Sequence, residues 1–232
     1  MNRNNNDNTQ PKYISASQLK TWITCQWQYH LRYGLGLQGE ESAAIYNGKV
    51  LHESFFSLIT DPLDWKSVNH PFLRILQKKF KHKPEVEPKI YQKEDSSLRL
   101  AIPDLVSAAD RLVVDLKTVT QLRLIHTIYE SDYLQMAFYR LVTRYPRSYI
   151  LKLYQAEDGE LFHRWHYIPP IKEHQELLLK TEREELKEYW AGNMKPVPNY
   201  KSCRFCTYKA SCVWYQEVKK DGLDNMGTVN ER

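Results

Sequence analysis

IPDLVSAADRLVVDLKT, residues 102–118, is the stretch of sequence that decides the fold. Two segments rich in Leu, Val and Ile flank the turn-like SAAD, and this pattern predicts an antiparallel pair of strands. Asp104 belongs to the first strand, and Asp115 and Lys117 belong to the second. Because side chains alternate along a strand, Asp115 and Lys117 should point to the same face. A hairpin of this length can bring Asp104 beside them.

Two carboxylates and one amine on one side of a sheet indicate a metal-dependent reaction centre. Carboxylate oxygens suit Mg²⁺ or Mn²⁺, and such a cation can activate a water and neutralise charge on a phosphate. Lys117 would hold the attacking water or stabilise charge on the phosphate oxygens. The strand that carries Asp115 should be buried and central, because it also contains Val113, Val114 and Leu116. Burying charged residues there is costly, so their presence indicates a function. The alternative is a solvated Asp–Lys pair at a sheet edge.

These residues resemble a known family. Asp104 followed by Asp115-x-Lys117 looks like the PD-(D/E)XK nuclease superfamily, and Pro103-Asp104 spells its first pair. The RecB-type branch of this superfamily often carries Gly before the first Asp, where this chain has Pro103. Proline lacks a backbone N–H donor and belongs at the edge or start of a strand. The backbone before Asp104 should therefore differ from that of RecB-type nucleases with Gly at this position.

Two flanking elements make the resemblance to the RecB-type branch more specific. Gly48-x-x-x-His52 looks like its G-x-x-x-H element, and Gln135-x-x-x-Tyr139 looks like its Q-x-x-x-Y element. The members of each pair are four residues apart, so each pair shares one face of a predicted helix.

The resemblance implies a nuclease active site that uses Mg²⁺ or Mn²⁺, with Gln135 and Tyr139 orienting the site or contacting DNA. The implied catalytic residues are Lys117, Asp104, Asp115, Gln135 and Tyr139, and the implied metal ligands are His52, Asp104, Asp115 and the backbone carbonyl of Leu116.

The four cysteines are unevenly placed, with Cys25 alone and Cys203, Cys206 and Cys212 forming a C-x2-C-x5-C group. The polar start of the chain resembles no export signal, so disulfides are not expected. Three clustered thiolates and one distant thiolate fit a [4Fe–4S] cluster better than zinc, and zinc with the same ligands remains the alternative. The pattern resembles the iron–sulfur subset of RecB-type nucleases, which includes the CRISPR-associated RecB-like nucleases and the AddB subunit. The cluster is expected to be structural and not redox-catalytic.

Hydrophobic periodicity predicts the order of helices and strands. Helices are expected at 15–33, 48–59, 71–80, 132–144 and 171–190, and strands at 98–106, 111–119, 147–155 and 161–168. This order predicts an α/β sandwich with a central mixed sheet flanked by helices, which the resemblance makes restriction-endonuclease-like. The expected organisation is a disordered tail at 1–11, a single nuclease domain at 12–220 whose cluster-binding part is 12–46 and 196–220, and a disordered tail at 221–232.

Composition limits the class of protein. The chain has 232 residues, 42% of them apolar, which is enough for a core. Its net charge of +5 is compatible with DNA as a partner but does not demonstrate one. No apolar run approaches the roughly 18 residues that span a bilayer, so we expect a cytoplasmic protein with no membrane partner.

The leading hypothesis is a DNA exonuclease or end-processing nuclease that acts on single-stranded or frayed ends, alone or with a helicase or a CRISPR integrase. One alternative is a catalytically silent DNA-end-binding module of the same fold. Such modules typically lose one Asp or the Lys, and this chain keeps all three. The other alternative is a zinc-stapled interaction protein, which would bind zinc and cleave nothing.

Overall fold

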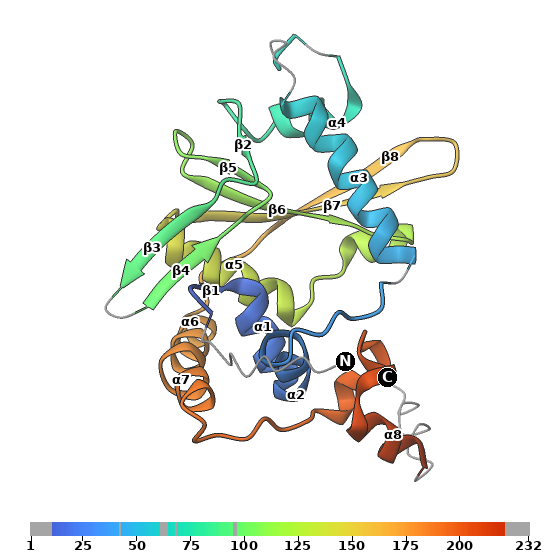
Figure 1. Ribbon diagram of the computed structural model, residues 1–232. Helices are drawn as coiled ribbons and strands as arrows, with labels where there is room; N and C mark the ends of the chain where they lie inside the picture. Colours follow the sequence, from blue (N-terminus) through green and yellow to red (C-terminus); the bar gives the residue numbers. More distant parts are fainter. Residues whose placement is uncertain (1–10, 42, 61–64, 68, 95–96, 221–232) are drawn as a thin grey trace. The chain divides into compact units, whose positions relative to one another are not determined.

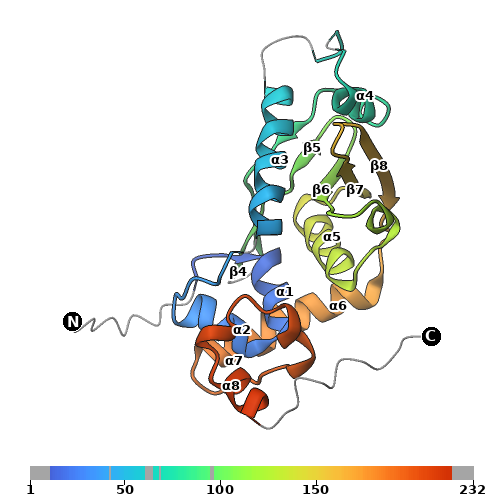
Figure 2. The same ribbon diagram turned by 90° about the vertical axis from the view of Figure 1, so that its right-hand side faces the viewer.

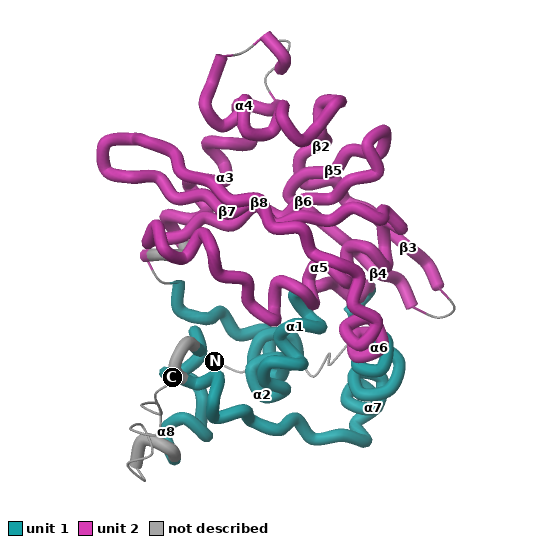
Figure 3. The backbone as a smooth tube through the Cα atoms, turned by 180° about the vertical axis from the view of Figure 1, so that it is seen from behind, with its two compact units in different colours: residues 1–12, 17–42, 179–232 teal, residues 13–16, 43–178 magenta. Residues whose placement is uncertain are grey.

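The computed structural model describes residues 11–41, 43–60, 65–67, 69–94 and 97–220. The tails expected at 1–11 and 221–232 lie outside these ranges, apart from Pro11. The chain divides into two compact units (Figure 3). Unit 1 comprises residues 1–12, 17–42 and 179–232, and unit 2 comprises residues 13–16 and 43–178.

The elements follow one another as Figure 1 shows. The helices are α1 (Ala16–Thr24), α2 (Gln26–Tyr29), α3 (Ala43–Thr60), α4 (Pro71–Gln77), α5 (Glu130–Thr143), α6 (Lys172–Lys180), α7 (Leu186–Trp190) and α8 (Val213–Lys220). The strands are β1 (Ile14–Ser15), β2 (Glu85–Val86), β3 (Ile90–Glu94), β4 (Ser97–Ala101), β5 (Leu105–Ser107), β6 (Leu112–Thr118), β7 (Arg147–Gln155) and β8 (Leu161–Tyr167). Two π-helical turns (His30–Gly34 and Thr181–Glu185) and three 3₁₀ turns (Leu122–His126, Tyr200–Phe205 and Lys209–Ser211) complete the described chain.

Unit 2 is built on a five-stranded mixed sheet in the order β2-β5-β6-β7-β8. Only β6 and β7 run parallel; the other neighbours are antiparallel. On one face, Leu112, Val114 and Leu116 of β6 pack into a core with side chains of α3 and α4 (Figures 1 and 2). The alternate residues Asp115 and Lys117 therefore point to the opposite face, where α5 lies.

The strand predicted at 98–106 is wrong as a single element, because it divides at residues 102–104 into β4 and β5. These two strands belong to different sheets, and β4 forms a separate three-stranded sheet with β1 and β3. Pro103 explains the break, since proline cannot donate a hydrogen bond to a continuing ladder. The structure thus has two mixed sheets in place of one central sheet, and Asp104 lies immediately before β5 rather than within a strand.

The helix predicted at 15–33 is also wrong as a continuous element. It is interrupted at Cys25, whose backbone is extended (φ −163°, ψ 109°) and whose Sγ accepts a hydrogen bond from the Gln28 N–H at the start of α2. Ser15 lies in β1, directly before α1 begins at Ala16. Gly34 ends the π-helical turn where a Cβ would lie 2.4 Å from the Tyr189 hydroxyl, so no side chain fits there.

The remaining predictions of secondary structure are confirmed with shifted ends. The hairpin of β7 and β8 turns at Gly159, whose φ of +87° suits glycine. The predicted helix 171–190 consists of α6, a π-helical turn and α7. The mixed α/β fold with helices flanking mixed sheets is confirmed. In the described residues, none of the helices combines the length and apolarity that a membrane crossing requires.

Candidate active site

Unit 2 contains a pocket of about 730 Å³, called here the carboxylate pocket, at the end of β6. It is lined by all the residues that the family resemblance singled out in the sequence: Gly48, His52, Asp104, Asp115, Leu116, Lys117, Gln135 and Tyr139. Three separate segments of sequence therefore meet at one place. Their roles in metal binding and catalysis stay predictions.

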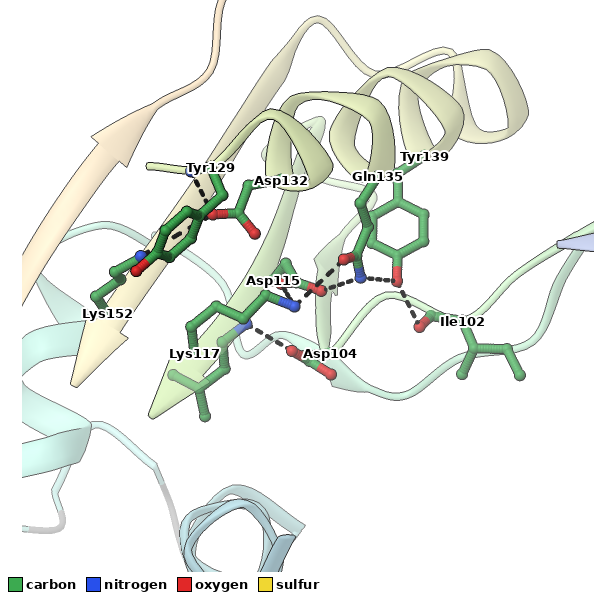
Figure 4. Close-up of polar contacts among 10 residues, drawn as sticks. Ile102, Asp104, Asp115, Lys117, Tyr129, Asp132, Gln135, Tyr139 and Lys152 are labelled. Carbon is green, nitrogen blue, oxygen red and sulfur yellow. Dashed lines mark hydrogen bonds and ion pairs between the residues drawn. The ribbon is translucent and has the colours of Figure 1, made fainter. Parts of the chain in front are cut away.

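Asp115 is the centre of the pocket's hydrogen-bond network (Figure 4). It is only 1% exposed, and its Oδ1 accepts a hydrogen bond of 2.6 Å from Gln135 Nε2. Its Oδ2 lies 2.7 Å from Lys117 Nζ as an ion pair. No group in the described part of the chain donates a hydrogen bond of normal geometry to this buried Oδ2. The cation that this oxygen contacts is the Lys117 ammonium, and carboxylate oxygens of this kind also suit a hard metal cation.

Asp104 adds a second carboxylate next to Asp115. Its Oδ2 accepts a hydrogen bond of 2.5 Å from the Leu116 N–H, which ties the segment before β5 to β6. Burial and the neighbouring charge of Asp115 raise the pKa of Asp104 well above the ordinary carboxyl value, and the Leu116 N–H and Lys117 only partly oppose them. A cation between the two carboxylates would favour their ionised forms.

Lys117 is the cationic partner of these carboxylates. Burial alone lowers its pKa, but the attraction of Asp115, reinforced by Asp104 and Asp132, outweighs burial and leaves the pKa raised. The amine therefore stays protonated at neutral pH and can donate hydrogen bonds to an anion, but it cannot act as a base there. About a third of its side chain is exposed, so it remains accessible from the pocket.

Gln135 and Tyr139 reach the pocket from consecutive turns of α5. Gln135 bonds Asp115, and its Oε1 accepts from Lys117 Nζ at 3.2 Å while its Nε2 lies 2.9 Å from the Tyr139 hydroxyl. The Tyr139 hydroxyl in turn donates to the Ile102 carbonyl at 3.1 Å, where the chain leaves β4 for β5. Burial first, and then the charges of Asp115 and Asp104, raise the pKa of Tyr139, so it remains a donor. Gln135 therefore holds the Asp115 carboxylate in place, and Tyr139 holds the segment that connects β4 to β5.

Residues of α3 form the opposite wall of the pocket. His52 is half-buried, and burial lowers its pKa more than the charge of Asp115 raises it. Its imidazole is therefore neutral at physiological pH, the form that binds a metal. Gly48 lies one turn earlier, where a Cβ would be 3.1 Å from Thr118 Oγ1. The absence of a side chain at Gly48 thus lets α3 approach the end of β6.

Lys152 is a further charged residue behind the pocket that the sequence motifs do not reveal. It pairs in register with Lys117 on the neighbouring strand β7 and is only 1% exposed. Its Nζ lies 3.9 Å from Asp132 and 4.8 Å from the ring centre of Tyr129 (Figure 4). Burial lowers the pKa of Lys152, and Asp132 opposes this effect. Asp132 also accepts a hydrogen bond from the Tyr129 N–H, so Lys152 helps to fix the start of α5.

The donors of the carboxylate pocket fit a hard divalent cation, because they are carboxylate oxygens, a neutral imidazole and a backbone carbonyl. No three His, Cys, Asp or Glu side chains of the described ranges are grouped closely enough to hold a metal ion. The Leu116 N–H and Lys117 Nζ contact the two carboxylates in this arrangement. The fit therefore rests on the chemistry of the donors that line the pocket.

The four cysteines all belong to unit 1 and are reduced. Burial raises the pKa of Cys203, and the charges of the other three thiols raise it further. No three cysteines of the described chain are grouped closely enough to hold a metal. Backbone N–H groups point at two of the sulfurs: Asn199 N lies 3.3 Å from Cys25 Sγ, and Tyr208 N lies 3.4 Å from Cys206 Sγ. Such donors stabilise thiolates, and they are the hydrogen bonds that tune metal-bound sulfur.

Comparison with known proteins agrees with this geometry. Residues 65–213, more than half of the chain, match the sequence model of the PD-(D/E)XK nuclease superfamily, and the chain belongs to that superfamily. Its fold is similar to that of SSO0001, with a TM-score of 0.54, 12% identity and 88% of each chain covered. It is also similar to a candidate exonuclease from Eubacterium rectale, with a TM-score of 0.57, 13% identity and coverage of 89% of this chain and 88% of that chain. No curated protein matches the chain in sequence.

Proposed function

We propose that this chain is a divalent-metal-dependent deoxyribonuclease that hydrolyses phosphodiester bonds at single-stranded or frayed DNA ends. The observation that carries the proposal is a pair of carboxylates, buried Asp115 and half-buried Asp104, beside one protonated lysine inside a pocket. Membership of a nuclease superfamily supports the same activity. The resemblance to RecB-type nucleases is the sole basis for two further parts of the proposal. These are an exonucleolytic or end-processing mode of cleavage and association with a helicase or a CRISPR integrase.

The proposal gives each pocket residue a task. Asp104, Asp115, His52 and the Leu116 carbonyl would hold Mg²⁺ or Mn²⁺, which when bound activates water and neutralises phosphate charge. Lys117 would donate hydrogen bonds to the attacking water or to a phosphate oxygen, because its amine is protonated and accessible. Gln135 and Tyr139 would keep Asp115 oriented through the hydrogen bonds described above.

The test is degradation of end-labelled single-stranded DNA with Mn²⁺ by anaerobically purified protein, beside Lys117→Ala and Lys172→Ala. Lys172 is a matched control because its side chain is 83% exposed, on α6, and takes no part in the pocket. We expect cleavage by the unchanged protein and by Lys172→Ala, and its loss in Lys117→Ala with DNA binding retained. DNA binding without cleavage by any of the three would instead identify a silent end-binding module.

We further propose that Cys25, Cys203, Cys206 and Cys212 hold a structural [4Fe–4S] cluster in unit 1. The proposal is supported by the C-x2-C-x5-C spacing, by the place of all four cysteines in one unit and by the N–H donors to Cys25 and Cys206. Four thiolates from the two ends of one unit would close a long loop, so the cluster would stabilise that unit.

Elemental analysis of anaerobically purified protein tests the cluster independently of nuclease activity. Four iron atoms and four acid-labile sulfides per chain, with a broad visible absorption, are expected of a [4Fe–4S] cluster. One zinc per chain with no iron would contradict the cluster and indicate a zinc site with the same four ligands.

A further inference from the structure

Glu87 is a carboxylate that no sequence motif contains, yet it lines the same pocket as Asp104 and Asp115. The antiparallel register of β2 and β5 pairs Glu85 with Val106 and Val86 with Leu105, so the next pair is Glu87 with Asp104. The Glu87 N–H donates to the Asp104 carbonyl at 3.0 Å and extends the ladder to this pair. Glu87 and Asp104 are therefore hydrogen-bonded neighbours, each one residue outside its strand.

Two acidic residues at this spacing are an unfavourable arrangement in a protein without a cation. Like charges on neighbouring residues of two paired segments destabilise their pairing. Within the described ranges, no Lys, Arg or His forms an ion pair with Glu87, because Lys117 pairs with Asp115 instead.

The backbone of Glu87 has an unfavourable conformation, as is common for residues of functional sites. Its φ is +45°, a left-handed conformation that a non-glycine residue rarely adopts. Glu87 also precedes Pro88, which disfavours helical conformations of the preceding residue. Glu87 is exposed, and it lines the carboxylate pocket together with Asp104 and Asp115.

We infer that Glu87 is an additional metal-binding residue, whose carboxylate joins Asp104 in holding the divalent cation of the carboxylate pocket. The inference rests on the proposed metal-dependent function and names a residue that this function had not included. A cation between Glu87 and Asp104 converts the repulsion of two neighbouring carboxylates into attraction of both to one charge. Glu87 would reach the cation from the end of β2.

The test measures Mn²⁺ binding by the 232-residue chain without DNA. The bound fraction is read from the decrease of the electron paramagnetic resonance signal of free Mn²⁺. Four proteins are compared: the unchanged chain, Glu87→Gln, Glu85→Gln and Asp115→Asn. Glu85 is the matched control, because it lies two residues away on the same strand, is exposed and does not line the pocket. We expect Glu87→Gln to weaken Mn²⁺ binding by about tenfold or more, and Glu85→Gln to change it less than about twofold.

A backbone effect is separated from a charge effect by Glu87→Gly. This variant removes the carboxylate and suits the positive φ, so its Mn²⁺ affinity should fall as in Glu87→Gln. Normal affinity in Glu87→Gln with loss in Glu87→Gly would assign the effect to the backbone and overturn the inference.

The remaining outcomes separate the inference from the proposed function. Normal Mn²⁺ binding in both Glu87 variants, with loss in Asp115→Asn, would overturn the role of Glu87 and leave the proposed nuclease intact. Absence of Mn²⁺ binding in the unchanged protein would overturn both.

Discussion

The carboxylate pocket of unit 2 and the cysteine region of unit 1 are both candidate metal sites, but they are built differently. In the pocket, a helix and a sheet position side chains that already bond one another, such as Gln135 to Asp115 and Tyr139 to the Ile102 carbonyl. In the cysteine region, a short 3₁₀ turn carries Cys203, and Cys206 follows it with an extended backbone. The buried apolar residues around the thiols are few. A metal should therefore add chemistry to the first region and structure to the second.

The largest expected effect is on the structure of the cysteine region. Cys203→Ser removes one of the four proposed ligands, so we expect metal content and the free energy of unfolding to fall together, the latter by at least about 3 kcal/mol. The measurement is iron and zinc per chain beside chemical unfolding under anaerobic conditions. Ser211→Ala, an exposed change next to Cys212, is the control and should alter neither. Full metal content and unchanged unfolding in Cys203→Ser would remove the proposed difference between the two regions.

The opposite behaviour is expected of the pocket. Asp115→Asn should reduce cleavage by about a thousandfold or more, because the buried carboxylate between Gln135 and Lys117 is lost. Without metal, the unfolding midpoint should not fall, since the change also removes repulsion between Asp104 and Asp115. DNA cleavage rates and unfolding midpoints, measured on the same preparations of Asp115→Asn and the unchanged protein, check both statements. A large loss of stability in Asp115→Asn would mean that the pocket, like the cysteine region, needs its charged groups for folding.

Gln135 tests whether the pocket is organised before the metal binds. Gln135→Ala removes hydrogen bonds to Asp115, Lys117 and Tyr139, and we expect cleavage to fall about 10- to 100-fold, as for residues that orient metal ligands. Steady-state rates over a range of Mn²⁺ concentrations are the measurement. Gln121→Ala changes an exposed glutamine that bonds Arg123, and it should have no effect. Equal activity in both variants would show that Asp115 does not depend on Gln135 for its orientation.

The sequence motifs predicted most of the pocket because the chemistry and the local structure coincide there. Asp115 and Lys117 alternate on one strand, and Gln135 and Tyr139 are one helical turn apart, so spacing alone predicts their common direction. Glu87 could not be found in this way. It lies among the charges of KKFKHKPEVEPK, and only the pairing of β2 with β5, set by tertiary structure, brings it to Asp104.

Errors in the predicted fold arose where one residue overrides a longer pattern. Leu, Val and Ile on both sides of residues 102–104 predict one strand, but Pro103 divides it between two sheets. The helical pattern at 15–33 continues through Cys25, whereas the chain there is extended and Cys25 Sγ accepts N–H groups of Gln28 and Asn199. Asn199 is 174 residues away, so no local pattern contains that information.

The turn SAAD provides the smallest test, a stabilising carboxylate that belongs to neither candidate site. Asp110 accepts hydrogen bonds from the N–H groups of Lys81 and His82, both at 3.1 Å, and from the Ser107 hydroxyl at 2.9 Å. Burial raises the pKa of Asp110, but these hydrogen bonds, together with the His82 side chain, outweigh burial and lower it below the ordinary value of 3.8. Asp110→Asn should therefore cost about 1–3 kcal/mol at pH 7.

The pH dependence gives this last prediction its sign. A carboxyl whose folded pKa is depressed contributes stability that is fully present above the unfolded pKa and disappears as pH falls through the folded pKa. The difference in unfolding free energy between the unchanged protein and Asp110→Asn should thus be constant from pH 7 to about 5 and shrink below 3.8. Urea unfolding over this pH range, with the exposed Glu157→Gln as control, measures it. A difference that persists below that pH would show that Asp110 acts through its shape and not through its charge.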